Sequence, residues 1–417
     1  MHIITLLNKC HPIKCFVYGK SRLQEVSGVE AMVVEVEARR NSRGVCSGCG
    51  KRGGTYDHLE VRRFEFVPLW CWAVFLEYRM RRVNCKRCGV KVERVPFGDA
   101  KNSQTPAYRS YLASWAKRLS WQETAEVFNT SWGKVFRAVQ WVVEYGLEHR
   151  DLSGVKAIGV DEVAWQKGHH YLTVVYQLDA GCRRLLWVGQ DRTVTTLLRF
   201  FQFWGPERTE GLQYVCSDMW RPYLQVLAKK AGHALHILDR FHIMANLNKA
   251  LDKVRAEEMR ALKAKGQGVL LVKSRWCLLK RPENLLEGQS TRLKDLLRMN
   301  LLTVRAYLLK ESLNLFWDYT SPYWAGRYLE RWCSQAMRSK IEPMKRMAHT
   351  LRSHQPLILN WFKAKKQFSS GIVEGFNGKL KLTLKRAFGF STYGAVEIAL
   401  YHTLGDLPEP KWAHRFY

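Results

Sequence analysis

The chain has 417 residues with 47% hydrophobic and 12% aromatic content, which excludes a disordered basic tail and indicates a packed protein of two or three domains. Its 67 Lys and Arg against 37 Asp and Glu give a formal net charge of +30 at pH 7. This excess predicts a polyanionic partner such as nucleic acid, the alternative being a basic surface without a special partner. Neither a signal-peptide pattern nor a transmembrane-length apolar run is found, so we expect a cytoplasmic protein with no membrane partner.

Residues 1–104 are rich in strand patterns and cysteines. Val74, Leu76, Tyr78 and Met80 alternate with residues 75, 77, 79 and 81, which predicts a strand with one buried face. Two Cys-x-x-Cys knuckles, each followed by a glycine, are typical of a tetrahedral structural Zn²⁺ site. Their ligands would be Cys46, Cys49, Cys85 and Cys88. Four separate buried thiols would not explain the duplicated spacing, and a redox pair would need one copy.

Residues 105–150 have the pattern of a helix-turn-helix. Ser120 and Glu123 form a capping box, residues 129–130 break the first helix, and the second is expected from Trp132 to a stop at Gly146. We expect this second helix to contact DNA in a major groove. The side chains that would do so are Lys134, Arg137 and Gln140. An ordinary helical hairpin packed on a core is the alternative.

The segment 151–250 alternates strands and helices. Strands are predicted over 157–163, 171–178, 184–188, 214–217 and 234–238, and helices over 194–204, 222–230 and from 241 onward. This is the strand order of the ribonuclease H fold, in which the first and fourth strands are neighbours. Residues 251–365 are predicted to be helical throughout, with scattered tryptophans that are more often core residues than contacts to a displaced base.

Three acidic residues are candidates for a metal site. Asp161 and Asp218 close the first and fourth strands, and Glu374 opens a basic helix. Carboxylates from neighbouring strands and a helix can hold two divalent cations, and an all-oxygen donor set favours Mg²⁺. Each aspartate taken alone could equally be a turn or helix-cap residue. Glu342 and Glu397 are poorer candidates for the third position.

The helix that carries Glu374 has a polar face suited to a phosphate backbone. Glu374, Asn377, Lys381 and Lys385 share that face by helical spacing. Glycines at positions 375 and 378 weaken a helix by about 1 kcal/mol each, a cost that close packing or the approach of a ligand would explain.

Several long motifs, in order, closely resemble bacterial insertion-sequence DDE transposases of the ISL3 group. They are Ile158–Trp165, Cys216–Tyr223, Val373–Lys381 and Lys385–Phe390. The resemblance implies a catalytic triad of Asp161, Asp218 and Glu374 with two Mg²⁺ or Mn²⁺ ions per active site. It also implies binding to terminal inverted repeats and target DNA, a homodimer or larger assembly on DNA, and a nucleoid-associated protein.

The resemblance extends to Asp239 and His242, which match an Asp-x-x-His element of related transposase groups. They would support the site rather than bind metal. A helix-capping aspartate beside a partly buried histidine is the equal alternative.

The predicted architecture is multidomain α/β. It consists of a zinc-binding β module (1–104), a helix-turn-helix (105–150), a ribonuclease H-like mixed α/β core (151–250), an all-α insertion (251–365) and a core completion with the glutamate helix (366–417). Two other functions stay open: a metal-dependent nuclease that cuts without joining, and a non-catalytic DNA-binding regulator derived from a transposase.

Overall fold

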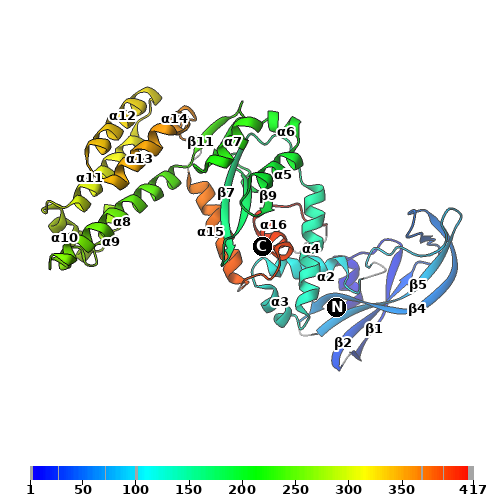
Figure 1. Cartoon of the computed structure of the whole chain (residues 1–417). Coiled ribbons are helices and arrows are strands. Elements are labelled where there is room, and N and C mark those ends of the chain that lie inside the picture. The colour runs from blue at the N-terminus through cyan, green and yellow to red at the C-terminus, as the bar shows by residue number, and fades with distance from the viewer. Residues whose placement is uncertain are drawn as a thin grey trace. The chain divides into compact units, whose positions relative to one another are not determined.

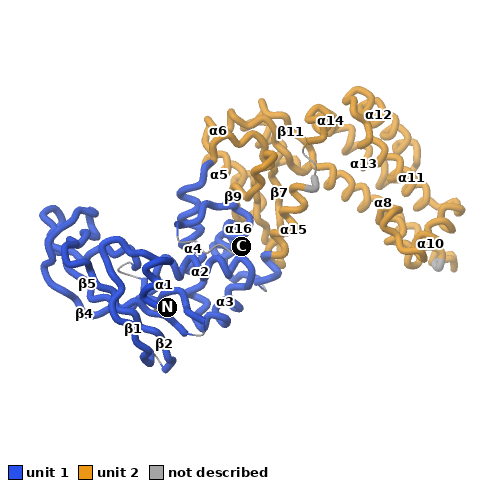
Figure 2. Tube along the Cα trace, turned by 180° about the vertical axis from the view of Figure 1, so that it is seen from behind, with its two compact units in different colours: residues 1–151, 383–417 blue, residues 152–382 orange. Residues whose placement is uncertain are grey.

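Two compact units form in the computed structural model, which describes residues 3–26, 28–70, 72–98, 102–367, 370–387 and 389–411 (Figure 1). One unit combines residues 1–151 with 383–417, and the other consists of residues 152–382 (Figure 2). The segment 366–417 is therefore divided between the two units. The finer domain boundaries proposed from the sequence stay predictions.

The N-terminal sheet has six strands in the order β1-β2-β5-β4-β3, with β6 paired to β5. The elements are α1 (Ile3–Cys10), β1 (Phe16–Val26), β2 (Val29–Ala38), β3 (Gly44–Val45), β4 (Arg52–Leu69), β5 (Trp72–Cys85) and β6 (Gly89–Val92). Neighbours are antiparallel except β2 and β5, which are parallel. The predicted alternation on β5 is confirmed, because Val74, Leu76, Tyr78 and Met80 are at most 4% exposed.

Four helices complete the first unit. They are α2 (Pro106–Ala116), α3 (Trp121–Val127), α4 (Trp132–His149) and α16 (Tyr393–Leu404). The capping box at Ser120 and the break at Asn129, whose φ is 44°, are confirmed. The predicted end of α4 at Gly146 is wrong, because the helix continues to His149. This glycine serves packing instead: a Cβ on it would lie 2.6 Å from Leu407 Cβ.

The second unit is built on a five-stranded sheet in the order β11-β10-β7-β8-β9. Its strands are β7 (Ala157–Gln166), β8 (His170–Gln177), β9 (Arg184–Gln190), β10 (Tyr214–Ser217) and β11 (Leu235–Leu238). β7, β8 and β9 are antiparallel, whereas β10 is parallel to both β7 and β11. The first and fourth strands of this region are therefore neighbours, as predicted.

Apolar side chains of the connecting helices cover this sheet. The helices are α5 (Val194–Trp204), α6 (Pro206–Glu210) and α7 (Arg221–Lys230). Phe200 and Trp204 of α5 are fully buried and belong to one core cluster with Ile158 of β7 and Val215 of β10. β7, which carries Asp161, and β10, which precedes Asp218, are thus anchored in one hydrophobic core.

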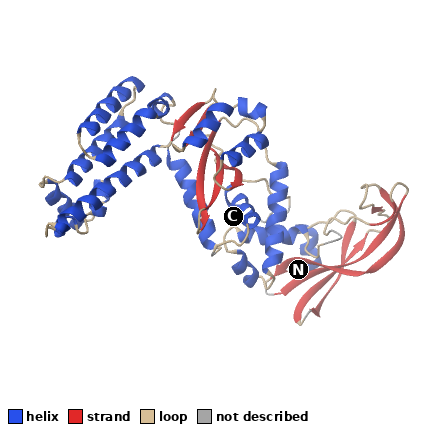
Figure 3. Cartoon of the chain, in the orientation of Figure 1, coloured by secondary structure: helices blue, strands red, loops and turns tan. Residues whose placement is uncertain are grey.

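Helices without strands follow from α8 to α14, as the sequence predicts (Figure 3). They are α8 (Arg240–Ala264), α9 (Arg275–Leu279), α10 (Glu287–Leu297), α11 (Leu302–Asn314), α12 (Pro322–Arg338), α13 (Glu342–Ser353) and α14 (Gln355–Lys363), with 3₁₀ segments at 268–271, 282–284 and 315–318. α15 (Ser370–Arg386) then leads to α16. None of the described helices combines the length and the apolar character that crossing a bilayer requires.

The tryptophans of this helical region fall into two groups. Trp317, Trp332 and Trp361 are at most 6% exposed, so they are core residues. Trp276 is 55% exposed and Trp324 60% exposed. Within the described helices, these two are therefore the candidates for contact with a displaced base.

Candidate functional site

Asp161 and Asp218 lie at the same level of two neighbouring parallel strands. β7 and β10 pair with Gly159 opposite Cys216, and each aspartate is two positions further along the chain. Asp218 directly follows β10, as predicted, but Asp161 lies within β7, which continues to Gln166, so the prediction that Asp161 closes its strand is wrong. Adjacent strands are about 4.8 Å apart, so the two residues start from neighbouring backbone positions. Asp161 is 5% exposed. Asp218 is half-buried and accepts a hydrogen bond from the Trp220 N–H at 2.9 Å.

Helix α15 packs closely on this part of the sheet. A Cβ on Gly159 would lie 3.0 Å from Val373 Cγ2, so the absence of a side chain lets the helix approach β7. One turn further, the Phe376 ring stacks on the Tyr176 ring of β8 with centroids 4.7 Å apart. The apolar face of α15 therefore fixes the direction of its polar face.

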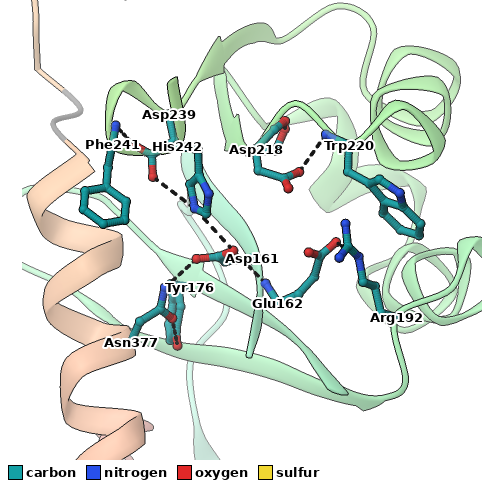
Figure 4. A network of polar contacts seen from close by, with 11 residues as sticks. Asp161, Glu162, Tyr176, Arg192, Asp218, Trp220, Asp239, Phe241, His242 and Asn377 are labelled. Atoms are coloured by element: carbon teal, nitrogen blue, oxygen red, sulfur yellow. Dashed lines mark hydrogen bonds and ion pairs between the residues drawn. The ribbon is translucent and has the colours of Figure 1, made fainter. Parts of the chain in front are cut away.

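Asn377 on α15 bridges the helix to Asp161 (Figure 4). Its side-chain N–H donates to Asp161 Oδ2, 216 positions away in the sequence, and its Oδ1 accepts a hydrogen bond from the Tyr176 hydroxyl at 3.1 Å. Asp161 Oδ1 also accepts from the Glu162 N–H at 2.7 Å. These contacts fix the orientation of a buried carboxylate.

Glu374 lies one turn before Asn377 on the same face of α15. Its side chain is exposed. Burial raises the pKa of Asp239 to about 6, and the charges of Asp161 and Glu374 contribute to this rise. The carboxylates of Asp161, Asp218 and Asp239 are called the acidic cluster below. The charge of Glu374 is therefore close enough to act on a member of this cluster.

His242 lies between two carboxylates (Figure 4). Its Nε2 is 3.7 Å from Asp161 Oδ1 and 3.8 Å from Asp239 Oδ2, distances of ion pairs rather than of hydrogen bonds. The contact with Asp161 raises the pKa of His242 to about 9, although burial opposes the change. Asp239 also caps α8, accepting from the Phe241 N–H at 2.8 Å, so the capping interpretation is confirmed. Support of the catalytic site by Asp239 and His242 stays a prediction.

Glu162, Arg192 and Trp220 also line the acidic cluster, and the sequence analysis missed them. Arg192 Nε is 3.0 Å from Glu162 Oε1, and its guanidinium lies 4.3 Å from the centre of the Trp220 ring. Burial raises the pKa of Glu162 to about 8, with the charge of Asp218 as the next cause. Successive side chains of a strand point to opposite faces of the sheet, so the sequence gives no reason to expect Glu162 in the same site as Asp161.

The carboxylate oxygens of Asp161, Asp218 and Glu374 do not all lie within ligand distance of a single point. Among the described residues, the cysteine cluster alone brings three or more candidate ligand atoms within 4.8 Å of one another. Two ions in a two-metal site are themselves about 3.5–4 Å apart, so its ligands need not meet at a single point. Burial raises the pKa of Asp218, and the charge of Asp161 adds to the rise. This mutual repulsion is what divalent cations relieve.

The outer face of α15 is open. Lys381 and Lys385 are exposed, and no described atom lies within 4 Å of a Cβ built on Gly375 or Gly378. Close packing, one of the two expected reasons for these glycines, is therefore wrong for the described surroundings. The other expected reason for Gly375 and Gly378, the approach of a ligand, stays a prediction.

The four predicted zinc ligands form one cluster in the N-terminal module. The sulfurs of Cys46, Cys49, Cys85 and Cys88 lie within 4.8 Å of one another. Backbone N–H groups of residues 88 and 87 lower the pKa of the Cys85 thiol to about 6, which favours the ligating thiolate. The glycines after the knuckles have φ of 71° and 69°, the left-handed backbone that the turns require. The cluster can hold a tetrahedral metal ion.

On α4, the predicted recognition helix, two of the three predicted DNA-contacting side chains already have partners within the protein. Lys134 forms an ion pair with Glu65 of β4, and Gln140 donates to Glu144 at 2.8 Å. Arg137 is exposed. Contact of these residues with DNA stays a prediction.

Comparison with known proteins shows the family of the chain. Residues 158–399 match the sequence profile of the ISL3 family, which is described as a transposase family. The transposase for insertion sequence element IS1001 of Bordetella parapertussis is 28% identical over 349 residues, which cover 83% of this chain and 85% of the relative. The transposase for IS1557 of Mycobacterium tuberculosis is 28% identical over 388 residues, covering 87% of this chain and 86% of the relative. The chain therefore belongs to the ISL3 transposase family and is an insertion-sequence transposase.

Proposed function

We propose that Asp161, Asp218 and Glu374 are the catalytic carboxylates of a ribonuclease H-like core that cuts insertion-sequence ends and joins them to target DNA. The observation that carries the proposal is the contact between Asn377 and Asp161, because it brings the glutamate helix to the buried strand aspartate. The strand order β11-β10-β7-β8-β9, with three antiparallel and two added parallel strands, supports the fold.

These residues fit a divalent-metal site, because their donors are carboxylate oxygens and because the charges of Asp161 and Asp218 repel each other. Asp161, Asp218 and Glu374 would hold two Mg²⁺ or Mn²⁺ ions. When bound, such ions activate the attacking oxygen and stabilise the leaving oxygen. Asn377 orients Asp161, and protonated His242 offsets the charge of Asp161 and Asp239.

The reaction would consist of two phosphoryl transfers. In cleavage, a water oxygen attacks the phosphorus at an element end, the bond to the 3′ oxygen breaks, and that oxygen takes up a proton. In strand transfer, the resulting 3′-OH loses its proton and attacks a phosphorus of target DNA, the bond to the adjacent 3′ oxygen of the target breaks, and that oxygen takes up a proton. Lys381 and Lys385 would follow the substrate backbone along α15.

The N-terminal module and the helix-turn-helix would recognise the terminal inverted repeats, with Zn²⁺ held by the four cysteines. Joining two ends to one target calls for a homodimer or larger assembly on DNA. Binding of chromosomal DNA would associate the protein with the nucleoid.

The test is cleavage of labelled element ends by Asp161→Asn, Asp218→Asn and Glu374→Gln. Each variant is expected to lose cleavage and keep end binding, whereas Glu342→Gln, an exposed glutamate on α13, should cleave normally. Retained cleavage in any one variant would remove that residue from the site.

Two further readouts separate the alternatives. Joined products from labelled ends would be missing for a nuclease that cuts without joining. A regulator would repress its promoter equally well as Asp161→Asn, and the wild type would then show no metal-dependent cleavage.

A further inference from the structure

Two basic hollows flank a buried ion pair in the N-terminal β module. The first, of about 300 Å³, is rimmed by exposed Lys14, Arg43, Arg52 and Arg94. The second, of about 400 Å³, is rimmed by exposed Arg39, Arg40 and Arg79. Arg81 lines both hollows.

The single acidic residue of the first hollow is already neutralised. Glu93 is 3% exposed, and its Oε2 lies 2.8–2.9 Å from the Arg81 guanidinium. Its Oε1 accepts hydrogen bonds from the Tyr78 hydroxyl at 2.5 Å and from the Arg81 N–H at 2.9 Å. All of these partners are internal, so Glu93 does not offset the cations at the rim.

The rim cations of the first hollow are available to a ligand. Across the described part of the chain, Lys14, Arg43, Arg52 and Arg94 have no salt bridge to a carboxylate. The second hollow contains Glu37, whose single charge faces three rim arginines. Both hollows therefore carry a net positive charge.

The rims are held by the backbone rather than by the cations themselves. The Arg94 N–H donates to Val45 O at 2.7 Å, next to the knuckle that begins at Cys46. The Arg81 guanidinium donates to Ser42 O at 3.0 Å, which ties the loop between the two hollows to β5. An anion that binds there need not order these loops, so the cost of binding is the rotamer freedom of the exposed side chains.

We propose that the two hollows bind phosphates of the backbone of duplex DNA and contribute to the electrostatic grip of this unit on element ends. Arginines dominate both rims, and the planar guanidinium pairs with phosphate oxygens in a bidentate manner. The recognition helix supplies less of this grip, because Lys134 is already paired with Glu65. The inference rests on the proposed function, since it takes duplex DNA ends as the substrate.

The test is the salt dependence of duplex binding by the full-length protein. The logarithm of the binding constant falls with the logarithm of salt concentration by about 0.9 per phosphate contact. Arg43→Gln with Arg94→Gln should reduce this slope by about 1.8, and so should Arg39→Gln with Arg40→Gln. A matched control with the same change of net charge is Lys9→Gln with Lys20→Gln, two exposed lysines outside both hollows, and it should keep the wild-type slope.

A conservative variant guards against loss of folding. Arg43→Lys with Arg94→Lys keeps the charges and should keep the slope. An unchanged slope in both Gln pairs would overturn the inference, and so would an equal loss in the Lys pair. A loss seen with single-stranded RNA but not with the duplex would also overturn it.

Failure of the inference and failure of the proposed function give different results. Metal-dependent cleavage by the wild type would still occur if the hollows do not bind phosphates. Absence of that cleavage, with the slopes behaving as expected, would refute the catalytic proposal alone.

Discussion

Asn377 offers the sharpest test of how the candidate active site is held together. The Asn377→Leu substitution keeps a side chain of similar size on α15 and removes the amide that donates to Asp161 Oδ2. It also removes the acceptor of the Tyr176 hydroxyl. Asp161 then loses the hydrogen bond that joins it to α15.

The expected size follows from the bond that is lost. A hydrogen bond to a charged group contributes about 1.5–3 kcal/mol, which corresponds to a factor of about 10 to 150. Loss of a residue that orients a metal ligand typically costs about 10- to 100-fold in metal affinity or activity. We therefore expect the half-saturating Mn²⁺ concentration for end cleavage to rise by about one to two orders of magnitude.

Two measurements make this prediction specific. Calorimetric titration with Mn²⁺ alone should show the same loss of affinity without any turnover. Tyr176→Phe removes a neutral hydrogen bond to Asn377 and should cost only about 0.5–1.5 kcal/mol, or up to about 12-fold. Wild-type Mn²⁺ dependence in Asn377→Leu would show that the amide does not position Asp161.

Three further predictions concern the first unit. Cys88→Ser should lower the zinc content after dialysis and the melting temperature, since structural zinc binding contributes to folding, whereas Cys10→Ser, an exposed free thiol, should change neither. Burial lowers the pKa of His402 to about 3, so on acidification this residue takes up a proton in the unfolded chain before it does so in the folded one. His402 alone should therefore account for about 2 kcal/mol of the stability lost between pH 7 and 5. His402→Leu should reduce the loss in urea titrations by about that amount, because the buried His11 and His236 contribute separately. Gly146→Ala should lower the free energy of unfolding by about 1–3 kcal/mol, because the new methyl would lie 2.6 Å from Leu407 Cβ. Gly133→Ala on the same helix is the control, because its methyl would meet only the end of the Arg137 side chain at 3.5 Å. It should leave the free energy of unfolding unchanged or raise it in the same titrations.

Much of the fold could be predicted because local chemistry and tertiary packing agree. Helix α5 has the predicted bounds, since Thr193 caps its start and Gly205 ends it. The β5 alternation places its apolar residues in the core. The end of α4 was missed because Gly146 has a tertiary role: its missing side chain makes room for the segment around Leu407.

The sequence predicted which residues are candidates for the site, but not the side-chain contacts among its residues. Strand order alone makes Asp161 and Asp218 neighbours. Glu162 and Arg192 could not be found in this way, because their pairing depends on side-chain directions within β7 and in the loop before α5. The partner of Lys134 was hidden for a similar reason, since Glu65 lies on a distant strand.

The late position of α15 has a consequence for synthesis of the enzyme. A nascent chain carries both strand aspartates long before the ribosome reaches Glu374 and Asn377, and the same C-terminal stretch continues into α16, which packs in the other unit. Polypeptides that end before α15 therefore lack the helix that contacts Asp161, and they also lack α16. Such fragments would lack the proposed catalytic Glu374, so we expect them to be unable to assemble the proposed site.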